Sequence, residues 1–153
     1  MDAESERLVA DDVARGVTRL FLRHDWMAVP EVPLGNARRA DLMALCAKGS
    51  ITIVEIKVSR ADLLGDGKWP DYLDYCDRYF WAVPQGFDLS LFDRDALMPA
   101  RTGLIVADRY DAAIIREPEE RPLAAARRKA ETLRLARRAA RRLILGKEAD
   151  EEA

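Results

Sequence analysis

The run from Ile51 to Val58 (ITIVEIKV) constrains the fold of this chain more than any other stretch. Six of its eight residues are β-branched, which predicts a central strand that is buried on both faces. Glu55 and Lys57 interrupt it, and burial of an unpaired charge is strongly unfavourable. Something specific must therefore offset these two charges, which makes the end of this strand a candidate functional site.

A second acid, Asp41, stands upstream in another strand-like run, residues 39–45, so that the two runs predict a β-hairpin. The length of its loop decides where Asp41 points. A three-residue loop, residues 48–50, places Asp41 opposite Lys57 and suits the positive φ that Gly49 can adopt. A five-residue loop places Asp41 opposite Glu55, and a two-residue loop turns it to the other face of the sheet.

If Asp41, Glu55 and Lys57 converge, they have the chemistry for phosphodiester hydrolysis. Two carboxylates offer hard oxygen ligands, which suit Mg²⁺ or Mn²⁺. The chain has one histidine, which argues against a zinc site with several histidines. Lys57 could orient or deprotonate the attacking water and offset charge in the transition state. Glu6, in the first predicted helix, is a candidate third metal ligand; alternatively it favours the helix dipole.

The order of predicted elements is αβββαβ, followed by two strands and a helix. The expected helices are 4–24, a short stretch from 59, 70–77 and a basic helix at 121–145; the expected strands are 26–33, 39–45, 51–58, 79–84, 102–107 and 112–116. This order predicts an α/β fold, a mixed central sheet flanked by helices on both sides. We expect one domain at 4–146, with a core at about 5–116, and a disordered acidic tail at 147–153.

The order of Asp41, Glu55 and Lys57 resembles the PD-(D/E)xK nuclease superfamily, although Ala40 stands where the motif has proline. A longer signature resembles the bacterial MmcB-related DNA repair proteins over about residues 5–116; it comprises VEIKVSRAD at 54–62, DxKWPDY at 66–72 and FWAVP at 80–84. The resemblance implies the nuclease-like fold and a role in DNA repair. It also implies that the two matching acids bind metal and that Lys57 assists the water.

The segment after the candidate strand holds possible DNA contacts. Gly65 and Gly67 would allow a close approach to a ligand. Lys68 could contact a phosphate and Tyr72 could stack on a splayed base. The alternative is a simple break between helices, with the acids on a solvated face. Trp69 is expected in the core, because tryptophan usually buries most of its area.

The basic helix at 121–145 offers a second candidate DNA contact. Eight arginines and lysines crowd residues 127–142 against Glu131 alone, and we assign DNA binding to four of them: Arg134, Arg137, Arg138 and Arg141. A narrow apolar stripe runs beside them, formed by Ala130, Leu133, Ala136, Ala140 and Leu143. The alternative is therefore a helix docked through that stripe, with a solvated basic face.

We expect a DNA repair protein that acts as a Mg²⁺-dependent (or Mn²⁺-dependent) nuclease, or, alternatively, a catalytically silent DNA- or protein-binding module with the same fold. Cys46 and Cys76 lack CxxC spacing, which favours reduced thiols in the cytoplasm. No apolar run could span a membrane, and the acidic N-terminus is unlike a secretory signal. DNA is the expected partner, together with other repair proteins and a second copy in a homodimer.

Overall fold

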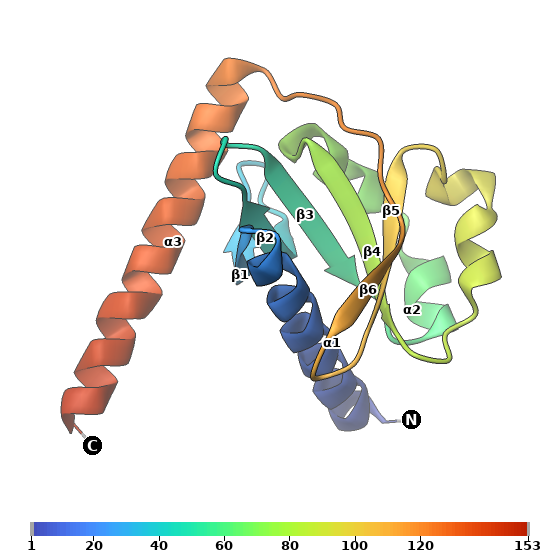
Figure 1. Cartoon of the computed structure of the whole chain (residues 1–153), viewed down its shortest axis with the longest axis horizontal. Coiled ribbons are helices and arrows are strands. Elements are labelled where there is room, and N and C mark those ends of the chain that lie inside the picture. The colour runs from blue at the N-terminus through green and yellow to red at the C-terminus, as the bar shows by residue number, and fades with distance from the viewer. Residues whose placement is uncertain (1, 153) are drawn as a thin grey trace.

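A computed structural model describes residues 2–152 and the side chains of residues 2–146. Helices and strands follow in the predicted order (Figure 1). The helices are α1 (Ala3–Arg23), α2 (Arg60–Gly65), α3 (Ala125–Glu152) and three 3₁₀ helices, η1 (Trp69–Tyr75), η2 (Leu89–Asp93) and η3 (Asp95–Leu97). The strands are β1 (Met27–Pro33), β2 (Arg39–Leu45), β3 (Ile51–Ile56), β4 (Arg78–Pro84), β5 (Thr102–Ala107) and β6 (Ala112–Arg116).

The six strands form one sheet in the order β1-β2-β3-β4-β5-β6. The pairs β1/β2, β2/β3 and β5/β6 are antiparallel, whereas β3/β4 and β4/β5 are parallel. This arrangement confirms the predicted mixed sheet with flanking helices. The proline-rich strand β1 lies at an edge, as its missing N–H donors require.

The loop of the β2–β3 hairpin has five residues, which is one of the three predicted lengths. Leu45 pairs with Ile51, so the loop comprises residues 46–50. Leu42 pairs with Val54, and the same register sets Asp41 opposite Glu55. Gly49 supplies the positive φ, 93°, and its N–H donates to the Cys46 carbonyl at 3.0 Å. Strand β3 ends at Ile56, so Lys57 lies just beyond the ladder.

One face of the sheet is covered by α1, which contacts all six strands. The helix begins at an Asp2 cap, whose carboxylate accepts from the Ser5 N–H at 2.8 Å. Its buried stripe, centred on Val17 and Phe21, packs against the α1-facing side of the sheet. Gly16 allows this closeness, because a Cβ there would lie 2.0 Å from the Asp108 carbonyl oxygen.

The opposite face carries an aromatic core beneath the short helices. The Trp69 ring centroid lies 4.9 Å from that of Trp81 and 5.4 Å from that of Tyr79. Trp69 is 3% exposed, which confirms its predicted place in the core. The helix predicted at 70–77 is the tighter η1, which starts at Trp69 with Pro70 in its first turn. Near its end lies Cys76, a buried free thiol.

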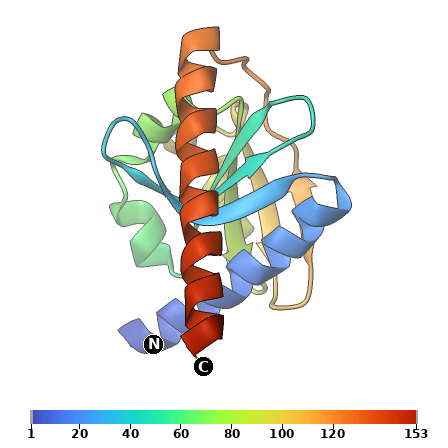
Figure 2. The ribbon, with the colours of Figure 1, turned by 90° about the vertical axis from the view of Figure 1, so that its left-hand side faces the viewer.

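The last helix, α3, runs along the β1 side of the sheet (Figures 1 and 2). It begins at Ala125 rather than at residue 121, because the preceding segment is held extended by Asp77: the Leu123 N–H donates to the Asp77 carboxylate at 2.9 Å. At its other end α3 continues to Glu152, past the predicted helix end at residue 145 and into the segment predicted as a disordered tail, 147–153. Among the described helices, none is long and apolar enough to cross a membrane.

The apolar stripe predicted to dock α3 faces solvent instead. Leu133 is 59% exposed and Leu143 is 63% exposed. The three alanines of the stripe, Ala130, Ala136 and Ala140, are exposed too. The helix is docked through Leu135 and through polar side chains, so the alternative of docking through the apolar stripe is wrong.

Candidate functional site

Asp41 and Glu55 face each other across neighbouring strands, and each carboxylate accepts a hydrogen bond from a backbone N–H of the opposite strand. Glu55 Oε2 accepts a hydrogen bond from the Asp41 N–H at 2.8 Å. Asp41 Oδ2 accepts one from the Ile56 N–H, also at 2.8 Å. Glu55 is 5% exposed and Asp41 is half-buried. The hairpin register and these two hydrogen bonds fix the predicted acidic pair at the end of β3.

Both carboxylates are held in an environment that disfavours negative charge. Burial raises the pKa of Asp41, and the Ile56 N–H only partly opposes this. Burial and then the Asp41 charge raise the pKa of Glu55 well above its ordinary value. Two buried acids that resist ionising together form a donor set that a divalent cation would stabilise. Mg²⁺ is commonly bound by one or two carboxylates plus substrate phosphates, so the pair fits such an ion.

Lys57 lies beside this pair but is bound by two other acids. Its Nζ donates to Asp66 Oδ2 at 2.8 Å and lies 3.7 Å from Asp62 Oδ1. Burial acts to lower the pKa of Lys57, but the Asp66 hydrogen bond and the two negative charges outweigh it, and the pKa is raised. The side chain is therefore a fixed ammonium ion, able to orient water or stabilise an anion, and poorly suited to act as a base.

Tyr72 is a part of the site that sequence reasoning placed in a different role. It is 9% exposed, and its hydroxyl donates to the Arg39 carbonyl at 3.0 Å. Its burial and the Glu55 charge raise its pKa, which shows that the phenol stays neutral beside the acids. A buried ring is not available to stack on a base, so the predicted stacking role is corrected to a wall of the acidic site.

Lys68 and Glu6 stand apart from the acidic pair. The backbone N–H of Lys68 donates to Asp66 Oδ1 at 3.0 Å, and the Lys68 side chain is exposed to solvent. Glu6 is half-buried on α1, the helix that covers the other face of the sheet. Within the described residues, no group of three or more histidine, cysteine, aspartate or glutamate side chains is placed to hold a metal ion. The pair Asp41 and Glu55 is therefore the donor set that the structure brings together.

Asp62 and Asp66 were not predicted as partners of Lys57. The sequence did contain a signal: Ser59 and Asp62 read as a helix cap, and the Ser59 hydroxyl does accept from the Asp62 N–H at 3.1 Å. A cap directly after the strand turns the chain back over Lys57. The acids of α2 and of the following loop are then the nearest counter-charges.

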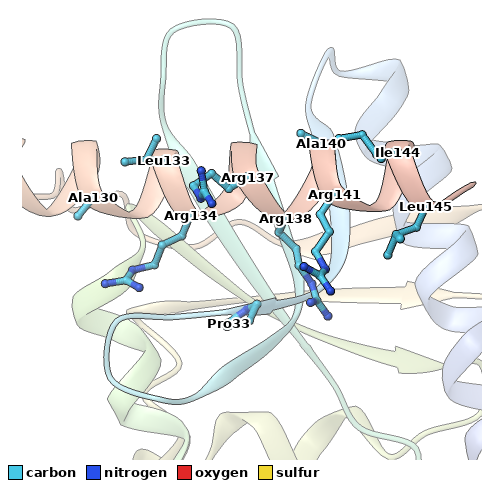
Figure 3. A pocket seen from close by; sticks show the side chains of 10 residues that line it. All are labelled: Pro33, Ala130, Leu133, Arg134, Arg137, Arg138, Ala140, Arg141, Ile144 and Leu145. Carbon is cyan, nitrogen blue, oxygen red and sulfur yellow. The ribbon is translucent and has the colours of Figure 1, made fainter. Parts of the chain in front are cut away.

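The four predicted DNA-binding arginines of α3 lie along one groove, of about 830 Å³, between the helix and β1 (Figure 3). Arg138 is half-buried, and its Nε donates to the Glu31 carbonyl at 3.2 Å. Arg134, Arg137 and Arg141 are exposed. The structure thus brings these four side chains together.

The fold and the site define a mixed α/β protein with a two-carboxylate centre. The chain belongs to the MmcB-like family: the family described as "DNA repair protein MmcB-like" matches residues 2–150. This confirms the predicted resemblance to MmcB-related proteins and supports a role in DNA repair.

Among solved structures, the chain is similar to "SPO1766 protein of unknown function" from Silicibacter pomeroyi. The two are 42% identical over 92% of each chain, with a TM-score of 0.83. No curated protein matches the chain. The similar structure thus supports the α/β fold, while its title names no activity.

Proposed function

We propose that this protein hydrolyses phosphodiester bonds of DNA during repair, with Mg²⁺ or Mn²⁺ held by Asp41 and Glu55. The observation that carries the proposal is the pair itself: two buried carboxylates opposite each other, with raised pKa values and an ammonium group beside them. The family of DNA repair proteins supports DNA as the substrate. The resemblance to the PD-(D/E)xK superfamily supports the same assignment of the three residues.

Each residue of the site has a distinct task in this proposal. When bound, the metal supplies Lewis-acid polarisation of a phosphoryl oxygen and a water of lowered pKa. Asp41 and Glu55 hold it, and their hydrogen bonds to the backbone fix their orientation. Lys57 offers a fixed positive charge to the phosphate or the attacking water. Tyr72 closes the site on its core side.

DNA would be held by the exposed cations around this site. Lys68 directly follows the loop that binds Lys57, and the arginines of α3 line the groove beside β1. Phosphate contacts of this kind contribute affinity that falls as salt rises. Glu6 is not assigned to the site, because it lies on α1, which covers the other face of the sheet.

One observation favours a second candidate, a DNA-binding module that does not cleave. Lys57 is engaged by Asp66 at 2.8 Å and by Asp62 at 3.7 Å, so its charge is already compensated. In the catalytic reading, that same contact holds Lys57 in place until the phosphate arrives. The two readings share the fold and differ in whether phosphodiester bonds are broken.

The test is incubation of the purified protein with labelled single-stranded, duplex, flap and junction DNA, in Mg²⁺, Mn²⁺ or EDTA. Asp41→Asn and Lys57→Ala should abolish cleavage, whereas Asp95→Asn, which removes an exposed acid on η3, should retain it. Calorimetry should show Mn²⁺ binding to the wild type and to Lys57→Ala, and none to Asp41→Asn. Salt-sensitive DNA binding without cleavage would overturn the nuclease in favour of the binding module.

A further inference from the structure

The contacts that hold α3 on the domain form one stripe along the helix. The stripe comprises Arg128, Glu131, Leu135, Arg138 and Arg142, spaced three or four residues apart. At one end, Arg128 donates to buried Asp77 at 2.5 and 2.6 Å. At the other, Arg142 donates to the carbonyls of Pro30 and Glu31. The helix is thus fixed along this length, and the side chains beside the stripe have a defined place.

The side of α3 next to this stripe carries exposed cations one turn apart. Arg134, Arg137 and Arg141 line the groove, together with Arg138 from the stripe (Figure 3). Figure 3 shows Arg138 and Arg141 extending from the helix toward Pro33 of β1. Within residues 2–146, Arg137 and Arg141 form no ion pair with an acid. Arg134, by contrast, lies 3.5 Å from Glu131 Oε2, so the charges without an acidic partner among these residues are those of Arg137 and Arg141.

The groove lies one strand away from the proposed metal site. In the β1/β2 ladder, Pro30 pairs with Leu42 and Val32 with Ala40, so that Glu31 lies opposite Asp41. The carbonyl of Glu31 is the group that Arg138 binds at 3.2 Å. Neighbouring strands of the sheet are about 4.8 Å apart. A DNA strand that runs from Asp41 across β1 would therefore enter the groove directly.

We infer that this groove binds the backbone of the DNA strand that is cut, and that it holds about three nucleotides to one side of the scissile phosphate. From Arg134 to Arg141 the helix rises about 10 Å, at roughly 1.5 Å per residue. One strand of B-form DNA advances by that distance along the duplex axis in about three nucleotides, at roughly 3.4 Å each. The assignment of the cut strand rests on the proposed function; the binding of a DNA backbone does not.

The lining of the groove also determines what is recognised. Besides the arginines it consists of Pro33 and aliphatic side chains of α3, among them Leu133 and Ile144. Arginines on phosphates and aliphatic groups on sugars position a strand but do not distinguish bases. Binding is therefore independent of sequence.

A second copy of the chain suits this surface less well than DNA. A two-fold contact through the groove would bring the same patch of each copy together. It would place Arg137 and Arg141 of one copy against those of the other, with like charges opposed. An anionic strand meets the same row with opposite charge, and we therefore commit to DNA as the occupant.

The test measures binding of fluorescent oligonucleotides to Asp41→Asn protein, in which the strand is not consumed. Adding Arg137→Ala and Arg141→Ala should lower affinity roughly tenfold or more and should reduce the salt slope by about two. The loss should be equal for oligonucleotides of different sequence. The matched control is Lys48→Ala with Lys129→Ala, two exposed lysines outside the groove, which should change the affinity and the slope much less.

Failure of this inference and failure of the nuclease proposal give different results. If the DNA affinity and the salt slope are unchanged in the double arginine variant, the inference that the groove binds DNA is overturned, whether or not the wild type cleaves. A dimer that Ile144→Asp dissociates without loss of DNA binding also overturns it. If the wild type cleaves, substrates with fewer than about three nucleotides on one side of the cut should react more slowly. Cleavage that is insensitive to that length would overturn the path of the cut strand.

Discussion

The two long helices are attached to the same sheet by opposite chemistry. Helix α1 lies across all six strands and buries apolar side chains such as Val17 and Phe21 completely. Helix α3 touches the domain mainly at β1 and η1, and one leucine, Leu135, is the buried apolar residue of its contact stripe. Buried apolar area contributes much of the stability of a domain, whereas hydrogen bonds contribute little net energy each. We therefore regard α1 as part of the folding unit and α3 as an arm placed on it.

The largest loss of stability is expected from a substitution in α1. Phe21→Ala removes a fully buried ring that lies 5.0 Å from Trp26 and 6.0 Å from Phe80, between ring centroids. We expect a loss of about 3–5 kcal/mol in the free energy of unfolding, measured in urea, because the cavity cannot be refilled. The neighbouring Leu22→Ala is the control: Leu22 is 61% exposed, and its loss should cost about 0.5 kcal/mol or less. Equal effects of the two substitutions would contradict the role given to α1.

A smaller effect is expected where α3 meets the domain. Arg128→Met leaves Asp77, which is 1% exposed, without the arginine that donates two hydrogen bonds to its carboxylate. The substitution should lower the free energy of unfolding by about 2–3 kcal/mol. The exposed pair of Arg121 and Glu119 provides a control, because Arg121→Met should leave stability unchanged. Hydrogen exchange should show faster opening of α3 in Arg128→Met, with the central strands less affected. Uniform acceleration over the whole sheet would instead make α3 part of the folding unit.

The ion pair of Asp77 and Arg128 predicts how the stability of the fold depends on pH. Burial acts to raise the pKa of Asp77, but hydrogen bonds from Arg128, Ile51 and Leu123 outweigh it, and the pKa is lowered. A lowered pKa in the folded state contributes stability that is present above the unfolded value, about 3.9, and is lost as pH falls below it. The wild type should therefore lose stability below about pH 4. Arg128→Met should show a weaker loss over the same range.

The sequence allowed the strands and the acidic pair to be predicted because their signals are local. The β-branched run at residues 51–58 marks a buried strand, and the position of Asp41 in the preceding strand leaves only a few registers. The choice among registers depended on the loop, whose five residues are closed by the pairing of Leu45 with Ile51. That choice needed the structure, because Gly49 suits more than one loop length.

The partners of the charged groups could not be predicted, because they depend on contacts between elements distant in the chain. Tyr72 reaches the acidic pair only because η1 packs over β3 and β4, from where its hydroxyl donates to the Arg39 carbonyl of β2. The inner face of α3 is set by Asp77 and by the carbonyls of β1, which offer partners to Arg128, Arg138 and Arg142. A hydrophobic pattern does not report such partners, and it indicated the exposed stripe at Leu133 and Leu143 instead.

The smallest effect on stability is expected at the acidic pair, Asp41 and Glu55. It also helps to distinguish the folding unit, to which the pair belongs, from the arm formed by α3. Burial raises the pKa of Asp41, and burial together with the Asp41 charge raises that of Glu55. Raised pKa values contribute stability that is present below the unfolded values, about 4, and is lost as pH rises through the folded values. At pH 7 the raised pKa values of the pair therefore lower the stability of the fold. Asp41→Asn removes one charge and keeps an oxygen that can accept from the Ile56 N–H.

Asp41→Asn should therefore raise the free energy of unfolding by about 1 kcal/mol at pH 7, and the gain should shrink as pH falls toward and below the unfolded values, about 4. Mg²⁺ or Mn²⁺ should stabilise the wild type at pH 7 and leave Asp41→Asn unchanged. Urea unfolding at both pH values measures the gain, with Asp95→Asn as the matched control. Because the hydrogen bonds of the Asp41 backbone N–H and carboxylate are to β3, hydrogen exchange of α3 should not change. A destabilised Asp41→Asn protein at pH 7 would show that the carboxylate is held by a partner other than a metal ion.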